Sequence, residues 1–148
     1  MRPIPANVIA HGLDACDVER IAAMLDRHGA RFLERCFTPA ERGYAESGRN
    51  THERLAARFA AKEAVFKALG TGWARGIGWT DAEVTRAPAG GPGLRLTGRA
   101  AEIAAERGIA SWSLSLTHTR GLAIASALAL APPDPARYSP CRPDTLTP

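Results

Sequence analysis

A helix whose charges lie in unexpected places constrains this chain more than any other feature. Residues 51–69 have a helical pattern in which Lys62 projects from the middle of an apolar stripe, while Glu63 and Lys67 share the adjacent face. Buried lysine and glutamate side chains need a charged partner, a hydrogen bond or a bound ion. The pattern therefore predicts that this helix forms the wall of a site at the edge of the core. The apolar stripe consists of Leu55, Phe59, Phe66 and Leu69.

The same helix has a face of small residues and a glycine-rich end. The small face would let another element approach closely. Gly70 ends the helix, and Gly70-Thr71-Gly72 is typical of a tight loop. Such a loop allows close approach of a ligand to the backbone, although it can also do no more than end the helix. The small face consists of Ala57, Ala60, Ala61, Ala64 and Ala68.

Helix signals also precede this segment. Residues 8–13 form a short apolar run that predicts a strand, with Asp14 at its end and Asp17 as the cap of a helix that begins at Val18 and closes at Gly29. Thr38-Pro39-Ala40-Glu41 predicts another helix start, with threonine as the cap, proline at the first position and glutamate at the third.

After the central helix the hydrophobic period changes to that of strands. The pattern predicts a hairpin, an alanine-rich helix and a second hairpin, which together give an α+β fold. The last strand has large residues on one face and alanines on the other. The expected segments are strand 79–86, strand 94–97, helix 99–106, strand 111–117 and strand 122–130.

The composition indicates one soluble domain. The chain has 148 residues, a hydrophobic fraction of 45% and a charged fraction of 23%. We expect a single domain over residues 1–131, followed by a proline-rich, disordered tail at 132–148. No apolar run is long enough to span a membrane, and no signal peptide opens the chain, so the sequence predicts a cytoplasmic protein with no membrane partner. Cys16, Cys36 and Cys141 have no CxxC spacing, which argues against a zinc site.

Three positions could carry chemistry. Asp14 and Glu63 are the carboxylates that a Mg²⁺ ion prefers, Lys67 lies one helical turn from Glu63, and His118 follows a strand lined by serine and threonine. A net charge of +4 suits an anionic partner. Plainer interpretations are open for each: Asp14 as a turn residue, Glu63 and Lys67 as a solvated pair, Lys62 as a side chain that reaches past the apolar stripe to water, and His118 as a hydrogen-bonding turn residue.

The motifs resemble those of a known family. Gly12-Leu13-Asp14 with Arg20, the segment 58–72 (RFAAKEAVFKALGTG), Ser115-Leu116-Thr117-His118-Thr119 and the helix start at 35–41 (RCFTPAE) resemble the holo-acyl-carrier-protein synthases in order and spacing. These are small bacterial 4'-phosphopantetheinyl transferases. The resemblance covers about residues 8–130. It implies the fold of that family, in which an antiparallel sheet packs against a long central helix.

The resemblance also implies an activity. The family transfers the 4'-phosphopantetheine arm of coenzyme A to a serine of apo acyl carrier protein, a step that serves fatty acid biosynthesis, and releases adenosine 3',5'-bisphosphate. By resemblance Asp14 and Glu63 are ligands of Mg²⁺, and Lys67 contacts the reacting phosphate and takes the serine proton. The positions that would bind coenzyme A are Arg58, Lys62, Lys67, Gly70, Thr71, Gly72, His118 and Thr119.

Partners follow from the same resemblance. Arg20 would meet the acidic recognition helix of the carrier protein, while Arg58 would either bind phosphate or fix the helix. Small members of the family form homotrimers with active sites between subunits, and the alanine faces would pack against those neighbours. A non-catalytic protein that binds coenzyme A or a carrier is one alternative. A nucleic-acid-binding module is another, but the sequence lacks a concentrated basic patch and a set of stacking aromatics.

Overall fold

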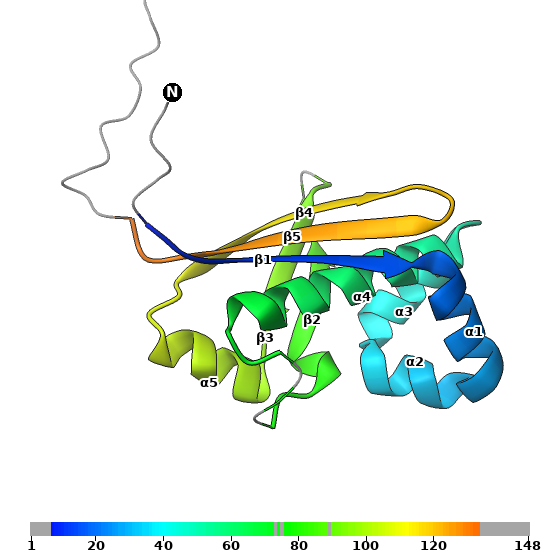
Figure 1. Ribbon diagram of the computed structural model, residues 1–148, viewed down its shortest axis with the longest axis horizontal. Coiled ribbons are helices and arrows are strands. Elements are labelled where there is room, and N and C mark those ends of the chain that lie inside the picture. Colours follow the sequence, from blue (N-terminus) through cyan, green and yellow to red (C-terminus); the bar gives the residue numbers. More distant parts are fainter. Residues whose placement is uncertain (1–6, 73, 75, 89, 134–148) are drawn as a thin grey trace, which may run out of the picture.

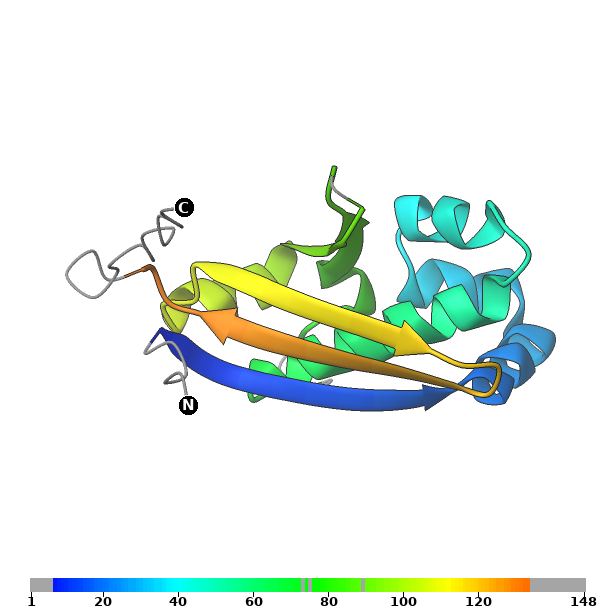
Figure 2. The ribbon, with the colours of Figure 1, turned by 90° about the horizontal axis from the view of Figure 1, so that it is seen from above.

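Three antiparallel strands cover one long helix in the computed structural model (Figures 1 and 2). The strand order is β1 (Val8–Asp17), β5 (Leu122–Leu130) and β4 (Ser111–His118), and α4 (Thr51–Ala68) packs against β1 and β5. The structure describes residues 7–72, 74, 76–88 and 90–133. The predicted α+β fold, an antiparallel sheet on a long central helix, is confirmed.

The other elements surround the two ends of α4. Three short helices lie near the start of α4, and a small two-stranded sheet and a further helix complete the helical side of the main sheet (Figure 1). These elements are α1 (Val18–His28), α2 (Ala30–Cys36), α3 (Pro39–Glu46), the 3₁₀ helix η1 (Trp79–Asp81), β2 (Ala82–Arg86), β3 (Pro92–Leu96) and α5 (Gly98–Glu106).

Close contact between β1 and α4 depends on small residues. A side chain at Gly12 would overlap the carbonyl oxygen of Ala64, so only glycine lets the strand lie this near the helix. The alanines of β5 and of α4 are buried, and these two elements pack against each other. The prediction that the alanine faces meet neighbouring subunits is therefore wrong. They face each other within one chain, because a sheet and a helix can pack this closely only through small side chains.

Two strand boundaries differ from the sequence prediction by about three residues or more, and those of β3 and β4 differ by one or two. β1 continues through Asp14 to Asp17, which pairs with Leu122. The inward positions of this strand include Gly12, Asp14 and Cys16, and an inward aspartate interrupts the apolar alternation by which a strand is recognised. The strand predicted over 79–86 begins only at Ala82, because residues 79–81 form a 3₁₀ turn in which the Asp81 side chain accepts a hydrogen bond from the amide of Gly78 at 3.1 Å.

The helix starts are confirmed in position and only partly in chemistry. Thr38 and Glu41 form the predicted capping box, with the Thr38 amide donating to Glu41 Oε2 at 2.9 Å and the Glu41 amide donating to Thr38 Oγ1 at 3.3 Å. Asp17 and Asn50 occupy cap positions, but neither side chain makes a capping hydrogen bond.

The remaining predictions concern cysteines, the tail and membranes. Cys16 and Cys36 are buried free thiols, and burial raises the pKa of each thiol to about 11. Cys141 and residues 134–148 of the predicted tail lie outside the described residues. In the described part of the chain, no helix has the length and apolar character needed to cross a membrane.

Candidate functional site

Asp14 and Lys67 meet where β1 crosses the last turns of α4. Lys67 Nζ donates to Asp14 Oδ1 at 2.6 Å and to the carbonyl oxygen of Leu13 at 3.0 Å. The Asp14 side chain is buried, whereas 53% of the Lys67 side chain is exposed. The pairing brings together two residues that are 53 positions apart in the sequence, and it does so because Gly12 allows β1 to approach the helix.

Glu63 completes this carboxylate–lysine cluster, defined here as Asp14, Glu63 and Lys67. Burial is the main reason that the pKa of the Glu63 carboxyl rises to about 7. The adjacent Asp14 carboxyl raises it further, both by hydrogen bonding to protonated Glu63 and by charge repulsion, while the positive charges of Arg20 and Lys67 lower it. A partly buried carboxyl whose ionisation is disfavoured by a neighbouring carboxylate forms a good environment for a cation.

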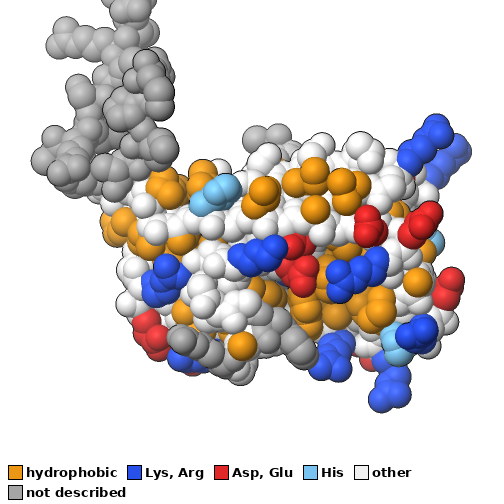
Figure 3. Space-filling view, in the orientation of Figure 1, with side chains coloured by type: hydrophobic (Ala, Val, Ile, Leu, Met, Phe, Trp, Pro, Cys, Tyr) orange, Lys and Arg blue, Asp and Glu red, His pale blue; other side chains and the backbone are white. Residues whose placement is uncertain are grey.

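The cluster fits a magnesium ion. Asp14 Oδ2 is buried and accepts no hydrogen bond from an amide, hydroxyl or amino group of the described residues. Among those residues no group of three or more His, Cys, Asp and Glu side chains could hold a metal. Mg²⁺ commonly takes one or two carboxylates and completes its shell with water and substrate phosphates. Figure 3 shows acidic and basic side chains mixed across this face, below hydrophobic side chains of the sheet.

Lys62 does not belong to the cluster, and its assignment to coenzyme A is corrected by its position. Its side chain has no exposed surface, and its ammonium group pairs with Glu41 at 2.7 Å. The same group donates to the carbonyl oxygens of Trp79 at 3.0 Å and Ala82 at 2.6 Å. An ammonium group with three protein acceptors in the core cannot also reach a phosphate, so the buried carboxylate is the partner that the helix pattern required.

Arg58 is likewise a buried residue of the helix. Its guanidinium lies 3.9 Å from the centre of the Tyr44 ring, and its Nη1 donates to the carbonyl oxygen of Arg54 at 3.4 Å. Burial lowers the pKa of the Arg58 guanidinium. These contacts favour a role in which Arg58 holds the helix in place over one in which it binds phosphate.

The Gly70-Thr71-Gly72 loop folds back onto the end of α4. Gly70 and Gly72 have positive φ values of 70° and 54°, which explains the glycines. The amides of Thr71 and Gly72 both donate to the carbonyl oxygen of Phe66 at 3.2 Å, so these amides are not free to bind a ligand. A residue that the sequence analysis missed, Arg107, donates to the carbonyl oxygen of Ala68 at 2.6 Å and lies beside Gly70. No local sequence signal links a residue after α5 to this loop.

His118 and Thr119 lie at the far edge of the sheet. His118 pairs with Ala123 of β5, and Ala123 pairs in turn with Cys16 of β1, so a whole strand separates His118 from the strand that carries Asp14. Arg20 is nearer to the cluster. Its guanidinium lies 5.7 Å from the centre of the Phe59 ring, and its charge acts on the Glu63 carboxyl. Within one chain the structure therefore gathers only part of the predicted set.

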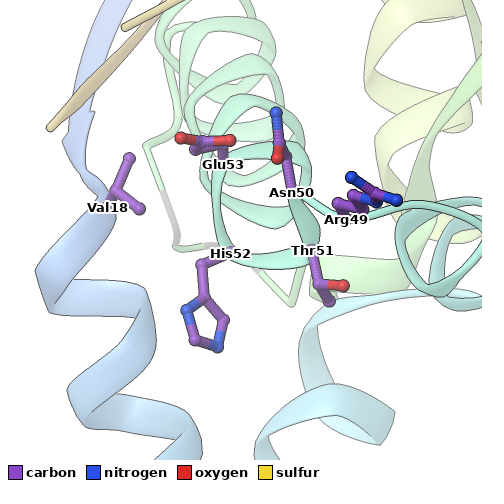
Figure 4. A pocket seen from close by; sticks show the side chains of 6 residues that line it. All are labelled: Val18, Arg49, Asn50, Thr51, His52 and Glu53. Atoms are coloured by element: carbon purple, nitrogen blue, oxygen red, sulfur yellow. The ribbon is translucent and has the colours of Figure 1, made fainter. Parts of the chain in front are cut away.

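A cavity of about 330 Å³ lies at the other end of α4, between that helix and the start of α1 (Figure 4). Ten residues separate Glu53 from Glu63, which corresponds to about 15 Å along the helix. The carboxylate–lysine cluster takes no part in the cavity wall. The lining residues are Val18, Arg49, Asn50, Thr51, His52 and Glu53.

Comparison with known proteins connects this geometry to a family. The family model described as the 4'-phosphopantetheinyl transferase superfamily matches residues 12–126. The holo-[acyl-carrier-protein] synthase of Desulforudis audaxviator is 49% identical over 130 residues, which cover 88% of this chain and 98% of that protein. The match thus includes all three residues of the carboxylate–lysine cluster.

Solved structures agree with the sequence comparison. The crystal structure of the Neisseria meningitidis holo-[acyl-carrier-protein] synthase has a TM-score of 0.75 and 29% identity, and covers 82% of this chain and 98% of that one. The Helicobacter pylori synthase in complex with coenzyme A has a TM-score of 0.71 and 29% identity, with coverage of 80% and 98%.

Proposed function

Because the chain belongs to the 4'-phosphopantetheinyl transferase superfamily, we propose that it transfers 4'-phosphopantetheine from coenzyme A to a serine of apo acyl carrier protein. The other product is adenosine 3',5'-bisphosphate. One observation carries the proposal: Asp14 and Glu63 form a carboxyl pair, Asp14 Oδ2 is buried and accepts no hydrogen bond from an amide, hydroxyl or amino group of the described residues, and the Lys67 ammonium group lies against Asp14 Oδ1. Such a group of charges suits a metal-bound pyrophosphate.

The reaction is a displacement at phosphorus. The serine oxygen forms a bond to the β-phosphorus of coenzyme A, and the bond from that phosphorus to the bridging oxygen breaks. The electron pair leaves with adenosine 3',5'-bisphosphate. Lys67 contacts the reacting phosphate and takes the hydroxyl proton, directly or through water.

Asp14 and Glu63 are the residues that would hold Mg²⁺. When bound, the ion supplies positive charge that neutralises the pyrophosphate and the oxygens on which charge develops. The two carboxylates leave room for water and phosphate ligands, as Mg²⁺ requires. The Oδ2 atom of Asp14 supports this assignment, because it is buried and no amide, hydroxyl or amino group of the described part of the chain donates to it, whereas a metal ion would compensate its charge.

The outer face of the sheet supports assembly into a homotrimer. Leu13, Leu122 and Ile124 are large apolar residues that are 55%, 37% and 37% exposed. This outer face, opposite α4, would be covered by neighbouring subunits. Association would also bring His118 and Thr119 of one subunit toward the carboxylate–lysine cluster of the next, where they would join the Gly70–Gly72 loop in binding coenzyme A.

Arg20 is the proposed contact for the carrier protein. It is an exposed cation on α1 close to Glu63, so an acidic helix that docks there would place its serine near the reacting phosphate. The reaction would take place in the cytoplasm, where it would supply holo carrier protein for fatty acid synthesis.

Mass spectrometry tests the proposed function. Purified protein is incubated with coenzyme A, Mg²⁺ and an apo acyl carrier protein, and we expect the carrier to gain the mass of one phosphopantetheine group. A carrier whose serine is replaced by alanine is the control and should gain nothing. Tight binding of coenzyme A without transfer to any of several carrier proteins would instead support the non-catalytic alternative.

A further inference from the structure

The buried pair formed by Glu41 and Lys62 has every polar atom bonded. Lys62 Nζ has three acceptors, which equals its number of N–H donors: the Glu41 carboxylate and the carbonyl oxygens of Trp79 and Ala82. Glu41 Oε1 accepts the amide of Val84 at 2.9 Å, and Oε2 accepts the amide of Thr38 at 2.9 Å. We call this the Glu41–Lys62 network.

The network joins four segments at the middle of α4. It connects the start of α3, the 3₁₀ helix η1 and strand β2 to one side chain of the central helix. Trp79, whose carbonyl is part of it, stacks on Phe59 with ring centres 4.5 Å apart. The network is thus a directional tie between α4 and the elements that do not belong to the main sheet.

Apart from the two hydrogen bonds that Lys67 donates to β1, the main sheet contacts α4 mostly through groups that do not fix the rotation of the helix. The helix faces β1 and β5 through alanines and Gly12, and smooth surfaces of this kind allow close approach without fixing rotation. Glu63 follows Lys62 directly and lies about 100° further around the helix. Any rotation of α4 that displaced Lys62 would therefore turn Glu63 and Lys67 away from Asp14.

We propose that the Glu41–Lys62 network sets the rotation of α4 and thereby positions Glu63 and Lys67 against Asp14. Glu41 and Lys62 are positioning residues for the metal and phosphate site, and this inference rests on the proposed transferase function. Stability alone is a weak reason for such a pair, because well-packed apolar residues of similar volume often stabilise a core equally well. A directional bond set supplies the orientation that apolar packing lacks.

The double variant Glu41→Gln/Lys62→Met tests this role. It removes both charges while keeping side chains of similar size, so it should fold where the single variants leave one uncompensated charge. Glu41→Asp is a second, milder variant that keeps both charges and shortens the tie by one methylene. Ile103→Ala is the matched control, since Ile103 is a buried core residue of α5 outside the network.

Metal affinity distinguishes a positioning role from a merely structural one, because a loss of stability alone would leave the affinity of the folded protein unchanged. Mn²⁺ binding is measured by electron paramagnetic resonance with coenzyme A present and no carrier protein, and the Mg²⁺ dependence of the transfer rate is measured separately. We expect the folded double variant to bind Mn²⁺ about tenfold more weakly, with Glu41→Asp intermediate, as for other residues that orient metal ligands. Ile103→Ala should lower the melting temperature and leave Mn²⁺ binding unchanged.

The outcomes separate the two proposals. If the wild-type protein transfers phosphopantetheine and the folded variants match it in Mn²⁺ binding and rate, the positioning role is refuted and the proposed function stands. If Ile103→Ala weakens Mn²⁺ binding as much as the network variants, the effect is one of general stability and the inference fails. A wild-type protein that does not transfer the group refutes the proposed function and, with it, this inference. Should the double variant not fold, Glu41→Asp decides the question.

Discussion

Two charge clusters lie on neighbouring turns of α4, and they differ in how completely their polar atoms are bonded. Around Lys62 every donor and acceptor has a partner, and the pair has no exposed surface. Around Glu63, the Oδ2 atom of Asp14 is buried and accepts no hydrogen bond from an amide, hydroxyl or amino group of the described residues. Burial, together with the neighbouring Asp14 carboxyl, raises the pKa of the Glu63 carboxyl to about 7. The fully bonded Glu41–Lys62 network stabilises the fold. The carboxylate–lysine cluster is the one whose polar groups are available to bind a ligand.

Replacing Glu63 should give the largest effect on activity. Glu63→Gln keeps the shape of the side chain but removes a proposed metal ligand, so we expect the transfer rate to fall about 10³-fold. The fold should survive, because the substitution removes a carboxyl group that a second carboxyl repels. Transfer is followed by mass spectrometry and folding by circular dichroism. Glu106→Gln, at an exposed ion pair with Arg99, is the control and should retain full activity.

Breaking the Glu41–Lys62 network should lower the stability of the fold more than any comparable change in the carboxylate–lysine cluster. Glu41→Gln leaves one side-chain oxygen to accept hydrogen bonds from three donors, and the Lys62 ammonium group loses its charged partner in the core. We expect the free energy of unfolding to fall by about 3 kcal/mol, measured by urea denaturation. Adding Lys62→Met should recover part of that loss. A Glu41→Gln protein as stable as the wild type would remove the contrast between the two clusters.

Lys67 should matter for the reaction and little for the fold. Lys67→Met removes the proposed phosphate contact and proton acceptor, and we expect about a 10²-fold lower transfer rate. Its ion pair with Asp14 involves a half-exposed side chain, so the loss of stability should be under about 1 kcal/mol. Steady-state kinetics at saturating Mg²⁺ and thermal unfolding measure the two effects. A large loss of stability with normal kinetics would make Lys67 a structural residue like Lys62.

The pH dependence of stability should show a smaller effect. The Glu63 carboxyl has its pKa raised from 4.5 to about 7 in the folded protein. Between these values the folded state binds more protons than the unfolded state, so this group makes stability fall as pH rises. Melting temperatures of metal-free protein should show that slope, and Glu63→Gln should lack its share of it. Mg²⁺ should flatten the slope, since the ion favours the ionised carboxylate; an identical slope in Glu63→Gln would place the titration elsewhere.

The sequence predicted much of the difference between the Glu41–Lys62 network and the carboxylate–lysine cluster. The rest depends on contacts between residues that are distant in the sequence. The position of Lys62 within the apolar stripe indicated either a bonded partner or a side chain that reaches water, and the capping box identified Glu41 as a residue in the first turn of α3. No local pattern could show that the two meet across 21 positions of chain. The family motif places Lys62 beside two proposed site residues, which is why resemblance alone assigned it to coenzyme A.

Other differences have similar causes. The inward Asp14 hid the second half of β1, because strand recognition relies on apolar alternation. The alanine faces indicated close packing correctly but could not indicate the partner, which is β5 of the same chain and not a neighbouring subunit. His118 and Thr119 were expected to bind coenzyme A, and the strand order places β5 between their end of β4 and the strand that carries Asp14.

The most direct test of the central claim is the location of the metal in a crystal grown with coenzyme A and Mn²⁺. We predict an anomalous difference peak bonded to carboxylate oxygens of both Asp14 and Glu63, with Lys67 near the pyrophosphate and the Glu41–Lys62 network unchanged. A peak that contacts neither carboxylate, in crystals of protein that is active in solution, would contradict the assignment of the carboxylate–lysine cluster as the metal site.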